Sequence, residues 1–205
     1  MAGPAATARL TGLARAGPGR VALEVDGRRW RVVPDEVVVR AGLSTGRELD
    51  RPTIRLLRRE LRRAEALQNA GRTLARRDVS EAGLEARLRR AGVAAEPARE
   101  ARETLRRVGV LDDERFASSR ALALAERGWG NAAVEAKLAA EGAPAEAIAA
   151  ALDGLAPERA RAERLVEGLP ARKVAALLAR RGFDPDVVEA IVPEVDAEGS
   201  AGIPW

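Results

Sequence analysis

Three glycines, Gly92, Gly142 and Gly182, stand at the same place in a pattern that repeats along the sequence. Two apolar residues precede each of them, eight and four positions before it. These residues are Leu84, Leu88, Val134, Leu138, Val174 and Leu178. A spacing of four places both residues of a pair on one helix face, and a glycine behind such a helix commonly ends it in the left-handed conformation. The pattern therefore predicts three tandem three-helix repeats, each with a middle helix that ends at its glycine.

The repeats predict a mainly α-helical protein. Composition agrees, because 46% of the residues are apolar but only 2% are aromatic, which suits helices packed through small contacts. We expect a small N-terminal β-hairpin with a short helix (1–50), a long helix with the first repeat (51–110), the second repeat (111–155), the third repeat (156–192) and a mobile tail (193–205). Small helical repeats bury little apolar surface alone, so we expect them to stack into an elongated, curved array.

The stretch LDDERFA near the middle of the chain fixes the start of the second repeat. Asp112 is a good N-cap, and Asp113 and Glu114 place negative charge in the first helical turn. Leu111 and Phe116 stand at the two positions of a hydrophobic staple. Helix initiation accounts for all three carboxylates, so we do not expect them to bind a metal or to act in catalysis.

The N-terminal segment predicts a β-hairpin. Apolar residues alternate on both sides of an Asp-Gly pair at 26–27, which is a preferred two-residue turn. With this turn, Leu23 is expected opposite Trp30 and Val21 opposite Val32, so that these four side chains share one face. Residues 8–14 are a weaker strand candidate, 34–41 are expected to form a short helix, and 42–46 read as a turn without the spacing of a phosphate loop.

A long amphipathic helix is expected from Asp50, an N-cap with Pro52 behind it, to about residue 77. One stripe of this helix is basic and contains Arg55, Arg58, Arg59, Arg62 and Arg63. Like charges at this spacing cost about 0.2–0.5 kcal/mol per pair unless a partner neutralises them. The stripe is either a surface for anions or a protein partner, or a solvated face. Further basic candidates for the same role are Arg76, Arg77, Arg87 and Arg90.

Two other residues are candidates for a partner surface. Trp129 lies between two glycines, at the break behind the first helix of the second repeat. It is either an exposed anchor for a partner or a plug at the junction between repeats. Arg115 lies beside Phe116, and together they are candidates for a binding surface, although a staple and core role is favoured for Phe116.

Composition excludes most catalytic arrangements. The sequence has no Cys and no His, which removes disulfides, thiolate or imidazole metal sites and histidine bases. It also shows no nucleophile beside a base and no cofactor loop, so we expect a protein that is not an enzyme and needs no cofactor or metal. No stretch approaches the roughly 20 apolar residues of a membrane span, and no signal pattern begins the chain, so we expect a soluble, intracellular protein. A monomer is the default expectation.

Charge is divided unevenly along the chain. The net charge is +3 over residues 1–49, +7 over 50–110 and −6 over 111–205. The basic first half suits phosphates or an acidic protein surface. The other interpretation is a set of solvated helix faces.

These features together resemble the RecX family of regulatory proteins. The resemblance rests on LDDERFA at 111–117 behind Arg-Arg-Val-Gly-Val, on the helix SEAGLEARLRRAG at 80–92, and on the tandem three-helix repeats. It covers about residues 63–192. The hairpin followed by DEVVVRAGLSTGREL is similar to the extension of the longer family members.

The resemblance implies a cytoplasmic bacterial protein of DNA repair, recombination and the SOS response. Such a protein binds the RecA recombinase, lies in the groove of its filament on single-stranded DNA, and restrains strand exchange, ATP hydrolysis and coprotease activity. The alternative is a general DNA-binding protein whose middle helices contact duplex DNA. The chain lacks a cluster of Asn, Gln and Lys for reading bases, so duplex DNA is the less favoured partner.

Overall fold

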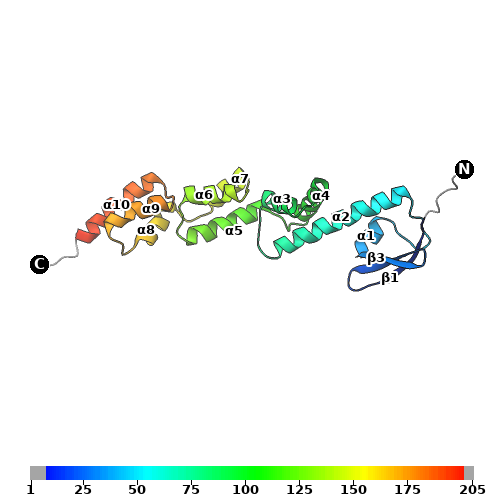
Figure 1. Ribbon diagram of the computed structural model, residues 1–205. Coiled ribbons are helices and arrows are strands. Elements are labelled where there is room, and N and C mark those ends of the chain that lie inside the picture. Colours follow the sequence, from blue (N-terminus) through cyan, green and yellow to red (C-terminus); the bar gives the residue numbers. More distant parts are fainter. Residues whose placement is uncertain (1–7, 201–205) are drawn as a thin grey trace. The chain divides into compact units, whose positions relative to one another are not determined.

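The computed structural model describes residues 8–200, and its side chains as far as residue 192. Within this range the chain forms three strands and ten helices (Figure 1). Two compact units divide the chain. The N-terminal unit holds the residues up to Arg76 together with Glu85–Leu105, and the C-terminal unit holds Arg77–Leu84 and the residues from Arg106 onward.

The N-terminal unit begins with a three-stranded antiparallel sheet in the order β1-β2-β3. Its strands are β1 (Leu10–Arg15), β2 (Arg20–Val25) and β3 (Arg28–Pro34). The predicted hairpin is confirmed in β2 and β3. Its turn is the predicted Asp-Gly pair, with φ of 50° at Asp26 and 75° at Gly27, the left-handed values that a two-residue hairpin turn needs. The weaker strand candidate forms β1 and pairs with β2.

The predicted pairing across the hairpin is wrong beyond the first residues. Glu24 pairs with Arg29, but Leu23 pairs with Arg31, so that Trp30 is an extra residue without a partner across the strands. This β-bulge shifts the register by one, and Val33 takes the place opposite Val21 that the sequence pattern gave to Val32. Val33 is fully buried, whereas Trp30 is 47% exposed.

Two helices complete the core of the N-terminal unit. They are α1 (Asp35–Arg40) and α2 (Arg51–Leu74), and α2 ends three residues earlier than expected. The Asp50 carboxylate accepts a hydrogen bond from the Thr53 backbone N–H (2.8 Å), which confirms the predicted N-cap and lowers the pKa of Asp50. The core beneath the sheet is formed by Leu10, Leu23, Val33, Val37, Ala41, Leu43, Leu57, Leu61 and Ala64.

A buried carboxylate ties α1 to α2. Glu60 on α2 is 4% exposed and accepts hydrogen bonds from Arg40 on α1 (2.8 Å) and from its neighbour Arg59 (3.0 Å). Burial opposes ionisation of Glu60, but the hydrogen bonds from the two arginines prevail and hold its pKa below the ordinary value of 4.5.

The three-helix repeats form as predicted. The second half of α2 supplies the first helix of the first repeat. The other helices of the repeats are α3 (Glu81–Arg90), α4 (Ala95–Arg107), α5 (Asp113–Glu126), α6 (Asn131–Ala140), α7 (Ala145–Asp153), α8 (Glu158–Val166), α9 (Ala171–Arg180) and α10 (Pro185–Ser200). All six apolar residues of the repeating pattern are at most 1% exposed. Gly92, Gly142 and Gly182 have φ of 76°, 84° and 74°, so each middle helix ends in the left-handed conformation.

The LDDERFA start signal is also confirmed. Asp112 accepts from the Arg115 backbone N–H (2.9 Å), α5 begins at Asp113, and Leu111 and Phe116 are 3% and 6% exposed. The end of the chain differs from the expectation. Helix α10 continues through Pro193 to Ser200, so residues 193–200, which the sequence assigns to a mobile tail, are helical. Residues 201–205 lie outside the described range.

The Glu60 contacts predict a pH-dependent loss of stability. The pKa of Glu60 is lower in the folded chain than in the unfolded chain. The Glu60 contacts therefore stabilise the fold fully above the pKa of the unfolded chain, and this stabilisation is lost as the pH falls through the pKa of the folded chain. We expect Glu60→Gln to lower the free energy of unfolding by about 1–2 kcal/mol near neutral pH. We also expect the variant to show a shallower decline below about pH 4.5 than the wild type.

Urea unfolding of the full chain followed by circular dichroism, at neutral and at acidic pH, measures both effects. Glu65→Gln is the matched control, because Glu65 lies on the same helix but is exposed. An equal loss of stability in both variants would contradict a special role for Glu60.

Candidate partner-binding surfaces

The predicted arginine stripe divides into a paired part and a free part. Arg63 is largely buried, with its side chain 15% exposed, and lies within 3.9 Å of Glu60 and 3.5 Å of Glu100. Arg59 pairs with Glu60 (3.0 Å). Arg63 therefore joins α2 to α4 within the N-terminal unit and is not available to a partner in the way that the stripe pattern suggested. The Arg59 side chain stays 63% exposed beside its ion pair.

The free part consists of Arg55, Arg58 and Arg62, which we call the α2 basic face. All three are exposed, and none forms an ion pair or hydrogen bond with any residue that the structure describes. Their spacings of three and four place them along one side of α2, where like charges repel one another. An anion bound along this side would relieve the repulsion, which makes the α2 basic face the strongest candidate for a phosphate-binding surface.

The other basic candidates differ in their surroundings. Arg76 and Arg77 are exposed just behind the end of α2. Arg90 is exposed and donates to the Ala86 carbonyl oxygen of its own helix, and Arg87 is half-buried with interactions of its own. Arg115 donates to the backbone oxygens of residues 109 and 110 (3.0 and 2.9 Å), so it closes the turn between α4 and α5.

The same kind of contact recurs at the starts of α3 and α6, both of which belong to the C-terminal unit, and its first copy lies at the start of α3. Ser80 caps α3 and donates its hydroxyl hydrogen to the Glu141 carbonyl oxygen at the end of α6 (2.5 Å). The Glu81 backbone N–H donates to the Asp113 carboxylate (2.7 Å). Asp113 therefore serves the first turn of the neighbouring helix α3, a role that the LDDERFA pattern did not indicate because its partner is distant in sequence.

The second copy lies at the start of α6. The Gly130 backbone N–H donates to the Arg181 carbonyl oxygen at the end of α9 (2.9 Å), and the Asn131 N–H donates to the Glu158 carboxylate (2.7 Å). A Cβ atom added to Gly130 would lie 2.2 Å from the Gly182 carbonyl oxygen. In both copies, an acidic residue at the start of one repeat caps the middle helix of the repeat before it.

Trp129 lies at this second junction. Its indole is half-buried and packs against the core of the second repeat. Lys137 Nζ lies 4.2 Å and the Arg181 guanidinium carbon 5.0 Å from the ring centroid, which are cation–π distances. Of the two interpretations of Trp129, these contacts favour a plug at the junction over an exposed anchor.

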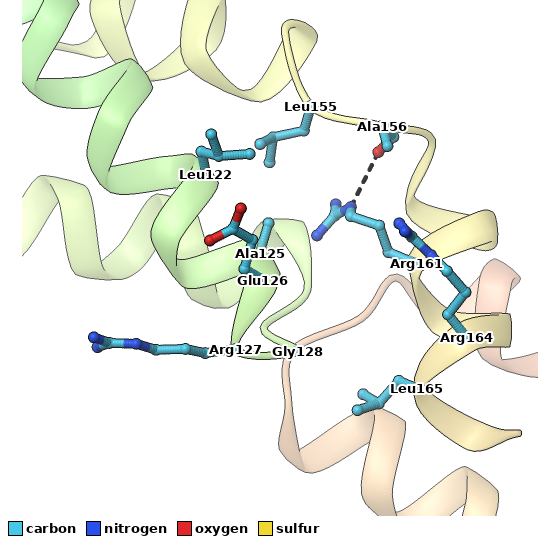
Figure 2. A pocket seen from close by; sticks show the side chains of 10 residues that line it. All are labelled: Leu122, Ala125, Glu126, Arg127, Gly128, Leu155, Ala156, Arg161, Arg164 and Leu165. Atoms are coloured by element: carbon cyan, nitrogen blue, oxygen red, sulfur yellow. Dashed lines mark hydrogen bonds between the residues drawn. The ribbon is translucent and has the colours of Figure 1, made fainter.

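A pocket of about 610 Å³ opens beside the same junction (Figure 2). Leu122, Leu155 and Leu165 form its apolar part, and Leu122 is 53% exposed. Arg127, Arg164 and Glu126 are exposed charged residues of its wall. Sequence reasoning missed this pocket, because its leucines come from α5, from α8 and from the loop before α8, which only the packing of the second and third repeats brings together.

Arg161 holds the base of the pocket. It is 7% exposed and donates to the carbonyl oxygens of Ala156 (3.0 Å, dashed in Figure 2) and Trp129 (2.9 Å), and to the Asn131 side-chain oxygen. Burial lowers its pKa from the ordinary value, but an arginine stays charged. The pocket thus suits an apolar side chain carried by an acidic segment.

Among the described residues, no group of three or more carboxylates is placed to hold a metal ion. No described helix is both long and apolar enough to cross a membrane.

Comparison with known proteins shows which family shares this sequence and fold. Residues 112–152 match the family model for the second three-helix domain of RecX. The regulatory protein RecX of Stenotrophomonas maltophilia (strain R551-3) is 39% identical over 150 residues, which cover 68% of this chain and 91% of that protein. The chain belongs to the RecX family. The matched domain begins at the Asp112 cap, so the family model covers all of the LDDERFA stretch but Leu111, whereas the helix at 80–92 lies outside it.

Solved RecX structures share the fold. A crystal structure of regulatory protein RecX has a TM-score of 0.78 with 22% identity, and the match covers 89% of this chain and 97% of the other. The crystal structure of RecX from Lactobacillus salivarius has a TM-score of 0.61 with 17% identity, over 66% of this chain and 97% of the other.

Two glycine substitutions test the close approach at the second junction, one at the junction and one away from it. Both Gly130 (φ −76°) and Gly154 (φ −78°) have backbone conformations that alanine adopts. The added Cβ at Gly130 meets Gly182 at 2.2 Å, whereas at Gly154 the nearest atom is 3.5 Å away. We expect Gly130→Ala to cost about 1–3 kcal/mol and Gly154→Ala to be neutral or slightly stabilising. Thermal unfolding of the two variants makes the comparison, and equal melting temperatures would contradict the close approach.

Proposed function

We propose that this RecX-family protein binds the RecA recombinase filament on single-stranded DNA and inhibits its strand exchange, ATP hydrolysis and coprotease activity. Membership of a family named for regulatory proteins supports a regulator. The observation that carries the proposal in this chain is the α2 basic face, whose three arginines form no ion pair with the described residues. The proposed setting is the cytoplasm, in DNA repair, recombination and the SOS response.

The α2 basic face fits a partner that presents regularly spaced negative charge. Its arginines recur at helical spacing, so they form a row rather than a single point of charge. Nucleic-acid phosphates and acidic protein side chains both meet this requirement, and a filament that carries DNA offers both.

The pocket lined by Leu122, Leu155 and Leu165 offers a second kind of contact. An apolar side chain entering it would displace water from three leucines, and the exposed Arg127 and Arg164 would face carboxylates beside that side chain. We propose that this pocket binds the protein component of the filament.

Duplex DNA binding through the middle helices is the less favoured alternative. A recognition helix presents its N-terminal residues to the bases. In this chain a carboxylate already occupies the N-terminus of two middle helices, Asp113 at α3 and Glu158 at α6. Those ends would bring negative charge toward the phosphates.

The proposal predicts that the chain, added at substoichiometric ratio, stops ATP hydrolysis by the cognate RecA on single-stranded DNA. Full hydrolysis in the presence of the folded chain would contradict it. We expect the triple variant Arg55→Glu, Arg58→Glu, Arg62→Glu to need at least about tenfold more protein for the same inhibition, because it removes three charge-assisted hydrogen-bond donors.

The matched control is Arg172→Glu, Lys173→Glu, Arg180→Glu on α9, which changes the net charge equally at exposed positions. Equal loss of inhibition in both triple variants would show an effect of net charge and contradict the role of the α2 basic face.

The pocket has a test of its own. Leu122→Ser removes an exposed apolar side chain from the pocket wall, so we expect a folded protein with about 5- to 30-fold weaker inhibition, the effect of losing one anchor worth about 1–2 kcal/mol. Val39→Ser is the control, because Val39 is 79% exposed on α1 and lines no described pocket. Unchanged inhibition by Leu122→Ser would contradict this assignment of the pocket.

A further inference from the structure

Trp30 is a large aromatic side chain that the sheet does not use. It is the extra residue of the bulge in β3, and it is 47% exposed. A bulge removes a residue from the regular alternation of a strand and turns its side chain in a new direction. The indole thus contributes little to the core of the N-terminal unit, which Leu23 and Val33 fill from the two strands.

The two described tryptophans differ in what covers their rings. Lys137 and Arg181 lie over the ring of Trp129, at 4.2 and 5.0 Å from its centroid. Among the residues with described side chains, no cation lies over the ring of Trp30 at such a distance. The ring of Trp30 is therefore open to an external group.

Three arginines surround Trp30 in the strand. Arg28, Arg29 and Arg31 are all exposed, and none forms a hydrogen bond or ion pair through its side chain with the described part of the chain. The carboxylates of the hairpin have other partners. Glu24 accepts from the Thr11 hydroxyl (3.0 Å), and Asp26 accepts from the Arg9 backbone N–H (2.9 Å). Neither carboxylate forms an ion pair with the three arginines beside the indole.

Strand β3 also borders a cleft of about 460 Å³ in the N-terminal unit. Arg20 and Arg31 line this cleft on the side of the sheet, and Glu36 and Glu65 line it as well. The cleft is therefore mixed in charge, and the unpaired positive charge of β3 is confined to the bulge.

We propose that the β3 bulge is a binding site for single-stranded DNA. One base stacks on the Trp30 indole, and Arg28, Arg29 and Arg31 contact the phosphates on either side of it. An exposed aromatic ring among cations that track the backbone is the combination that single-stranded nucleic acid requires, since every base has a face that stacks. The inference rests on the proposed function only for its biological setting, a filament that contains single-stranded DNA.

Protection of the sheet edge explains part of this arrangement. Charged residues and a bulge both discourage an edge strand from pairing with another chain. They do not explain a tryptophan at the bulge, because a small or charged residue there protects the edge equally well without exposing an aromatic ring. An acidic protein segment is the other occupant that the charges fit, and binding measurements with an oligonucleotide separate it from DNA.

The test is fluorescence anisotropy of a labelled oligo(dT) titrated with the full chain. We expect Trp30→Ala to raise the Kd about 5- to 100-fold, the loss of one stacked base. Trp30→Phe keeps an aromatic ring and is expected to retain most of the affinity. Replacing Arg28, Arg29 and Arg31 by Ala should reduce the slope of log K against log salt by about 0.7 for each phosphate that the variant no longer binds. Val39→Ala serves as the control for loss of an exposed apolar side chain.

An unchanged Kd for folded Trp30→Ala overturns the inference, and it leaves an acidic protein segment as the occupant. Oligo(dT) binding tests the DNA site, whereas inhibition of RecA by the wild-type chain tests the proposed function, so the two can fail separately. Wild-type inhibition with oligo(dT) binding independent of Trp30 overturns the DNA site alone. Trp30-dependent oligo(dT) binding without inhibition supports the DNA site and overturns the proposed function.

Discussion

The packing within the C-terminal unit depends on a close approach at the glycines that end two of the middle helices, Gly142 behind α6 and Gly182 behind α9. At Gly142 and Gly182 the left-handed conformation turns the chain, and the missing side chain lets that turn lie against the first turn of the preceding middle helix. A Cβ at Gly182 would lie 2.6 Å from the Cβ of Ala133. Gly142 and Gly182 therefore each end one helix and admit the preceding middle helix, whereas Gly92 serves only to end α3.

The junctions also use several charged side chains for hydrogen bonds within the protein, so these side chains are not available to a partner. Asp113 and Glu158 are used to cap the middle helices, and Arg161 is used to hold the loop around Trp129. The hydrogen bonds of these charged side chains are made within the protein. Arginines that lie away from the junctions, on α2 and on β3, keep their charge free for a partner.

Much of the fold was predictable because its signals are local. A cap such as Asp112 and a glycine such as Gly92 act within a few residues, so their pattern specifies the ends of helices. The errors arose where a distant residue decides the outcome. The stripe pattern grouped Arg63 with its neighbours, but Glu100 on α4 and the buried Glu60 hold its side chain. Alternation placed Trp30 inside the sheet, but a bulge removed it from that face.

The order of residues was enough to specify the element types, the helix ends and the number of repeats, since capping, turn formation and amphipathic spacing depend on neighbours along the chain. Packing in three dimensions was needed to decide which charges are neutralised, where the leucine-lined pocket opens and which tryptophan stays uncovered. These properties depend on residues far apart in sequence, such as Leu122 and Leu165 or Trp129 and Arg181, whose proximity follows from packing. A local sequence pattern cannot show whether a charged residue will be neutralised by a residue that is distant in sequence and becomes its neighbour only on folding.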